Sequence, residues 1–161
     1  MNLKQSRLIT LSACETGLSE AMGSRAEEYV GLPAGFLQAG GSAIVASLWA
    51  VDDLSTALLM ERFYANLLPA DHNGPGEDPD TRSPLPPAEA LRRAQIWLRD
   101  SVTGKQVRDY LAQALSKGYI EAHQAITYRR DYDDYPDDAH PFKRPYYWAA
   151  FSISGAEATR K

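Results

Sequence analysis

The sequence is short of cysteine, of positive charge and of long apolar runs. A single cysteine in 161 residues excludes an internal disulfide and suits a reducing, cytosolic compartment. The net charge of −4 provides no basic excess to attract nucleic acid or an anionic membrane surface. No apolar run of about 18 residues is present, and the N-terminus lacks a signal-peptide pattern. These deficits favour a cytoplasmic protein that binds neither nucleic acid nor membrane.

What remains is the composition of an ordinary globular domain. Hydrophobic residues make up 44% of the chain and charged residues 24%, which is enough apolar material for one buried core. Residues 1–161 are therefore expected to form a single domain. Irregular loops are predicted at 69–87, where proline, glycine and aspartate dominate, and at 131–145.

The first half of the chain alternates between strand and helix patterns. Continuous apolar runs at 8–13 and 43–49 are typical of strands covered on both faces, as in a parallel sheet. Helical spacing of apolar residues covers 26–39 and ends at a glycine pair, and a second helix is predicted at 54–68. Strand, helix, strand, helix is the order of an α/β fold.

The second half is more helical and closes with a strand pattern. Pro87 is expected to open a helix that runs to Asp100, and a shorter helix is predicted at 107–115. Residues 118–130 fit no single pattern. The aromatic and apolar run at 146–153 predicts a last strand, with its aromatic residues in the core.

Cys14 stands directly after the first predicted strand, in the sequence SACETG. Active sites of open α/β sheets lie beyond the carboxyl ends of the strands, so this thiol could act as a nucleophile there. Its own N–H could then stabilise a developing oxyanion. Free cysteine is more often buried and inert, so position alone favours a packing role.

A cysteine nucleophile normally requires a histidine base, and the chain has three histidines. His72 lies in the polar loop and is expected to be solvated, and His123 is expected at the surface or at its boundary with the core. His140 precedes the last predicted strand, but the residues around Cys14 do not match the papain-like signature that such a downstream histidine accompanies.

Three segments together resemble the CHAT domain, a caspase-like family of cysteine peptidases in clan CD. They are LITLSACETGLSE, the stretch YVGLPAGFLQAGGSAIVASLWAVDDLSTALLMERFYANL, and RPYYWAAFSISG, and they span most of the chain. The resemblance implies a caspase–haemoglobinase fold: a three-layer, mostly parallel sheet with helices on both faces. It also places the family's nucleophile on Cys14.

The same resemblance reveals a missing part. In the family, the base is a histidine in a His-Gly motif that closes the strand before the cysteine strand, and no His-Gly pair occurs in this chain. The chain therefore resembles the C-terminal portion of the domain, without its N-terminal strands. Without the base, a thiol of ordinary pKa is only a few per cent ionised at pH 7. The neighbouring Glu15 disfavours the thiolate further.

Two aspartates follow the second predicted strand in SLWAVDD. Asp52 or Asp53 could line a pocket for a basic substrate residue. The alternative, which we favour for both, is that they cap the next helix. At the C-terminal end, the family often has a histidine before the proline of PYYWAAF, where this chain has Arg144.

The resemblance predicts a cysteine endopeptidase that acts through a Cys14 thiolate on a protein or peptide substrate, without a metal or organic cofactor. This chain alone is expected to be inactive or very weak. An upstream half of the domain or a helical-repeat segment is the expected partner. The competing interpretation is a truncated or degenerate interaction module without enzymatic activity.

Overall fold

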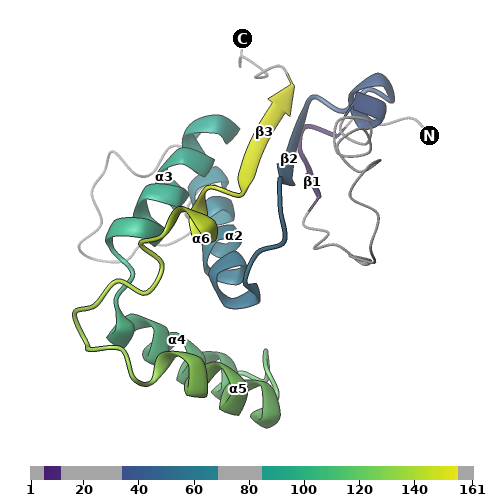
Figure 1. The fold of residues 1–161 in the computed structure, drawn as a ribbon. Coiled ribbons are helices and arrows are strands. Elements are labelled where there is room, and N and C mark those ends of the chain that lie inside the picture. The colour runs from purple at the N-terminus through teal and green to yellow at the C-terminus, as the bar shows by residue number, and fades with distance from the viewer. Residues whose placement is uncertain (1–5, 12–33, 69–84, 156–161) are drawn as a thin grey trace, which may run out of the picture.

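A computed structural model describes residues 6–11, 34–68 and 85–155 of the chain. These residues form an α/β fold of three strands and six helical segments (Figure 1). In chain order, the elements are β1 (Ile9–Leu11), a short helical segment at 34–38, β2 (Ala43–Ser47), α2 (Asp53–Leu67), α3 (Pro87–Asp100), α4 (Gly104–Ser116), α5 (Ala122–Tyr132), α6 (Pro145–Trp148) and β3 (Phe151–Gly155).

β2 is the central strand of the sheet, whose order is β1-β2-β3. β1 pairs with β2 in parallel, with Thr10 opposite Val45, whereas β3 pairs with β2 antiparallel, with Ile153 opposite Val45. The described sheet is therefore mixed rather than mostly parallel. Because β3 runs backwards, it begins at the edge where β1 and β2 end.

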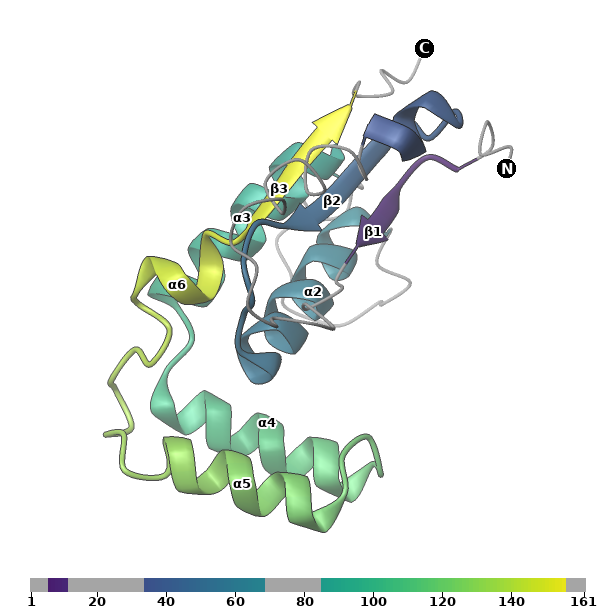
Figure 2. The same cartoon turned by 45° about the vertical axis from the view of Figure 1, so that its right-hand side comes forward.

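α2 and α3 pack side by side against one face of this sheet (Figure 2). The Tyr64 hydroxyl of α2 lies 2.7 Å from the Thr10 hydroxyl of β1, and Gln95 of α3 donates to the Phe151 carbonyl of β3 at 2.9 Å. Both long helices next to the sheet share this face, so helices on both faces remain a prediction.

The core lies between the sheet and these two helices. Its buried members come from the sheet, from α2 and from α3. Burying a valine, leucine or phenylalanine side chain stabilises the fold by about 1.5–3 kcal/mol. The central ones are Val45, Leu59, Phe63, Ala94, Leu98 and Phe151.

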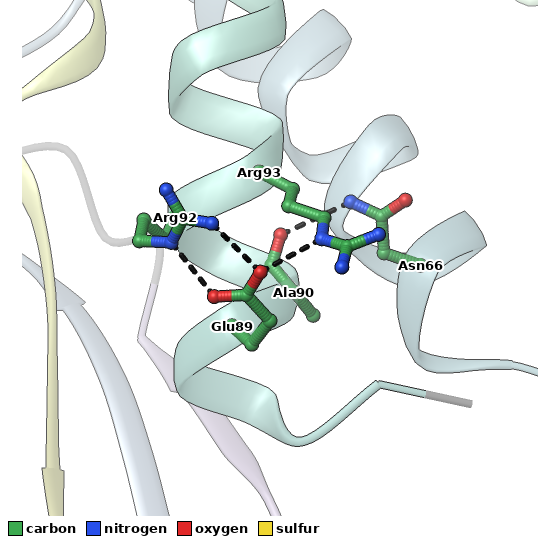
Figure 3. Close-up of polar contacts among 5 residues, drawn as sticks. All are labelled: Asn66, Glu89, Ala90, Arg92 and Arg93. Atoms are coloured by element: carbon green, nitrogen blue, oxygen red, sulfur yellow. Dashed lines mark hydrogen bonds and ion pairs between the residues drawn. The ribbon is translucent and has the colours of Figure 1, made fainter. Parts of the chain in front are cut away.

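Start signals in the sequence set both long helices. Asp52 is the N-cap of α2, and Pro87 is the first residue of α3, as predicted. Glu89 in the first turn of α3 accepts hydrogen bonds from Arg92 and Arg93 (Figure 3). In the same view, the Asn66 amide donates to the Ala90 carbonyl at 3.1 Å and joins the end of α2 to the start of α3.

α4 and α5 form an antiparallel hairpin that extends from the core (Figure 2). Thr103 and Gln106 form a capping box at the start of α4, which is a longer version of the helix predicted at 107–115. α5 occupies the segment that fitted no pattern. Only Ala125 and Tyr132 of its eleven residues are buried, so an apolar stripe that would predict a helix is lacking.

The strand predicted at 146–153 is wrong in its first half. Pro145 opens the short helix α6, and the strand β3 begins only at Phe151. No α6 residue is fully buried: Tyr147 and Trp148 pack against the core while partly exposed, and Tyr146 is exposed. Proline favours the first helical position because its φ is already fixed there, and this local signal outweighs the β propensity of the aromatic residues.

The other predicted elements are shorter in the structure or only partly described. Of the helix expected at 26–39, residues 34–39 are described and 34–38 are helical, and the stop signal is confirmed by the positive φ of 102° at Gly40. Residues 69–84 of the first predicted loop are outside the described residues. The second predicted loop is irregular between α5 and α6.

Candidate functional site

The candidate site lies at the carboxyl edge of the sheet, where β1 ends at Leu11 and β2 ends at Ser47. Parallel pairing brings these two ends together. β3 begins at the same edge, with Phe151 opposite Ser47 and the Leu48 N–H donating to the Ala150 carbonyl at 2.8 Å. Loops at such an edge can converge on a substrate.

Cys14 follows the end of β1 by three residues and lies outside the described residues. Its predicted roles as nucleophile and as the source of an oxyanion-binding N–H therefore stay predictions. β1 supplies the framework for them, because a strand held in the sheet fixes where the chain leaves it.

Asp52 caps α2, as the sequence indicated. Its Oδ1 accepts from the Ser55 N–H at 2.8 Å, and its carbonyl accepts from the Ser55 hydroxyl at 3.0 Å. The same Oδ1 also accepts from the Tyr132 hydroxyl, which is 3.1 Å away at the end of α5. Asp52 thus fixes the start of α2 and joins the hairpin to the carboxyl edge.

Asp53 differs from its neighbour because its side chain is exposed, in the first turn of α2. Tyr128 of α5 is close enough that Asp53 and Asp52, after the larger effect of burial, raise the pKa of its hydroxyl. Burial, followed by Asp52, raises the pKa of Tyr132, so this phenol stays protonated and donates to the carboxylate. α5 therefore places tyrosines beside both carboxylates.

Neither described histidine lies among these groups. The Nδ1 of His140 is 3.2 Å from the Val102 carbonyl after α3. His123 is exposed on α5, as predicted, and its nearest acid is Glu121 at 3.4 Å. His72 is outside the described residues. Arg144 is exposed and forms the N-cap of α6.

Two side chains form contacts near this edge that the sequence did not predict. Tyr132 is 5% exposed and contacts Asp52 across 80 residues of chain, a separation over which no local pattern is informative. Trp49 is half-buried against the core, and its Nε1 donates to the Tyr146 carbonyl at 3.1 Å. This bond holds α6 against the loop that follows β2.

Within the described ranges, no three His, Cys, Asp or Glu side chains are grouped so that they could hold a metal ion. Among the helices that the structure describes, none has both the length and the apolar character needed to cross a bilayer.

The fold and the site define an α/β protein with a candidate substrate site at the carboxyl edge of its sheet. The family model of the CHAT domain matches residues 1–156, nearly the whole chain, so the protein belongs to the CHAT domain family. No curated protein and no solved structure matches it.

Proposed function

We propose that this chain is the C-terminal part of a caspase-like cysteine endopeptidase domain, with Cys14 as its nucleophile. Membership of the CHAT family carries this proposal. The sheet supports it, because the paired parallel strands β1 and β2 end at the same edge, and Cys14 follows β1 by three residues in the sequence while Asp52 follows β2. Attack of the thiolate on a peptide carbonyl would form a thioester, which water then hydrolyses.

The domain is proposed to be incomplete in this chain. His140 is occupied at the Val102 carbonyl and His123 is exposed on α5, so neither takes the place of a base beside Cys14. The base would come from an upstream segment or a separate chain that adds strands to the sheet. β1 favours this arrangement, since within the described residues it pairs with β2 alone and is only half-buried.

Asp53 is the proposed contact for a basic residue of the substrate. Asp52 is already engaged by Ser55 and Tyr132, whereas the Asp53 carboxylate is exposed at the same edge. An Asp53→Asn variant of the completed enzyme should raise KM for a substrate with lysine or arginine and leave KM for a neutral substrate unchanged.

Alkylation kinetics test the nucleophile and its activation. With the base on another segment, the rate of Cys14 modification by iodoacetamide should rise with pH around the ordinary thiol pKa of about 8.5 in this chain. Cys14→Ser provides the blank, since Cys14 is the only cysteine. A midpoint more than one pH unit lower would show that the thiol is already activated, and would overturn the proposed incompleteness.

The genomic sequence upstream of the Met1 codon gives a second test. A strand-like apolar run that ends in His-Gly is expected there or in a neighbouring gene. Its absence from both would favour the second candidate function, an interaction module without activity. Among the residues that the structure describes, β1 has a strand partner on one side only, and this observation favours the second candidate. An interaction module of this kind should form a concentration-dependent dimer or a stable complex in light scattering, and a strict monomer would count against this candidate function.

A further inference from the structure

A pocket of about 250 Å³ lies where α2, α3 and α4 meet. Its volume is below the roughly 300 Å³ at which drug-sized sites begin, so it suits a small molecule. The side chains that line it come from one face of α2, from the end of α3 and from the first two turns of α4. Those that matter here are Leu58, Glu61, Arg62, Trp97, Val102 and Tyr110.

The pocket has an apolar floor. Leu58 and Val102 are both buried members of the core cluster, and Trp97 packs against that cluster with part of its indole exposed. An apolar group of a ligand placed here would bury the exposed part of this apolar surface, which favours binding.

Two opposite charges, on adjacent residues of α2, border this floor. The Arg62 guanidinium lies over the Trp97 ring, 5.4 Å from its centroid, and forms no ion pair with any residue in the described ranges. Glu61 lies on the α4 side, where burial and then this carboxylate raise the pKa of Tyr110. A cation and an anion on adjacent residues of one helix are complementary to a ligand that carries both charges close together.

We propose that this pocket binds a free α-amino acid with an apolar or aromatic side chain. The ligand carboxylate pairs with Arg62, its ammonium group pairs with Glu61, and its side chain covers Leu58 and Val102 beside Trp97. The ligand is neutral overall, which matches one arginine and one glutamate. Binding here would also join α4 of the hairpin to α2 and α3 of the core.

Titration with phenylalanine, followed in NMR spectra by the indole N–H of Trp97, tests the proposal on the intact chain. The signal is assigned by its loss in Trp97→Phe. We expect a saturable shift with a dissociation constant on the order of a millimolar, the range for about a dozen heavy atoms in an open pocket. Phenylacetate and phenethylamine, which each lack one charge, and alanine, which lacks the ring, should bind at least about tenfold more weakly.

Charge-neutral variants complete the test. Arg62→Gln and Glu61→Gln should each weaken phenylalanine binding about tenfold or more, while Arg130→Gln on exposed α5 leaves it unchanged. All three positions are at the surface, so circular dichroism should show an unchanged fold. Absence of a saturable shift, or equal binding of phenethylamine, would overturn the proposal. Cys14 takes no part in this experiment, so its failure leaves the peptidase proposal intact.

Discussion

The layer formed by the sheet, α2 and α3 differs from the α4–α5 hairpin in what holds each together. α2 and α3 bury nine residues between them, and all of these except Ser55 share one core with the sheet. α4 buries four residues and α5 two, and of these Val107, Leu111 and Tyr132 belong to the same core. The layer therefore has more apolar burial than the hairpin, which relies more on its caps and on contacts at its base.

The base of the hairpin is an aromatic cluster. Tyr132 stacks on Tyr135 and packs against Phe142, whose ring centroid is 5.5 Å away, and Phe142 in turn meets Tyr147. Arg108 of α4 also pairs with Asp137. Because these contacts are fewer than those of the layer, the hairpin should open locally at a lower free energy.

The largest expected effect is at the centre of the layer. Phe63 is fully buried, so Phe63→Ala should lower the free energy of unfolding by about 3–5 kcal/mol in urea titrations. Because this loss could prevent folding, Phe63→Leu supplies a milder variant. Ile126→Ala in the hairpin, where the side chain is 70% exposed, should change stability by less than about 0.5 kcal/mol. Equal losses at Phe63 and Ile126 would remove the distinction between the regions.

Asp52, the link between the two regions, comes next. Asp52→Ala removes the cap of α2 and leaves the buried Tyr132 hydroxyl without its acceptor, so a loss of about 2 kcal/mol is expected in the same titration. Asp52→Asn keeps an acceptor and should cost much less. If the asparagine variant is as unstable as the alanine variant, the carboxylate charge rather than the cap is what stabilises this end of α2.

Removing the Tyr132 hydroxyl alone tests the hairpin side of that link. Tyr132→Phe keeps the stacked ring, so unfolding should become easier by only about 1 kcal/mol. Hydrogen exchange should show faster opening of α5 and unchanged protection of α3. Faster exchange in α3 to the same degree would mean that hairpin and layer open together.

The smallest expected effect concerns the exposed surface of α3. Hydrogen bonds from Arg92 and then Arg93 hold the pKa of Glu89 at about 2, below its ordinary value of 4.5. The folded-state pKa is depressed, so the stabilisation is present above pH 4.5 and is lost as the pH falls towards 2. Glu89→Gln should lack this part of the acid dependence of Tm. A Glu89 titration midpoint near 4.5 in NMR spectra of the folded protein would contradict it.

The sequence predicted the elements that carry strong local signals. α2 and α3 begin within one residue of their expected positions because Asp52 and Pro87 mark them. α5 could not be predicted, because its stability comes from a capping box and from Tyr132 rather than from an apolar stripe. The same holds for the candidate site. The role of Asp52 as a helix cap was predicted from the sequence, whereas its hydrogen bond to Tyr132 depends on tertiary packing and could not be predicted.

The antiparallel direction of β3 has a mechanical consequence. The chain enters β1 and leaves β3 at the same edge of the sheet, opposite the carboxyl edge (Figure 1). A pulling force applied between these two points would peel both outer strands away from β2 from one end. The ladder hydrogen bonds would then break one after another rather than all at once, and the sheet should yield at low force.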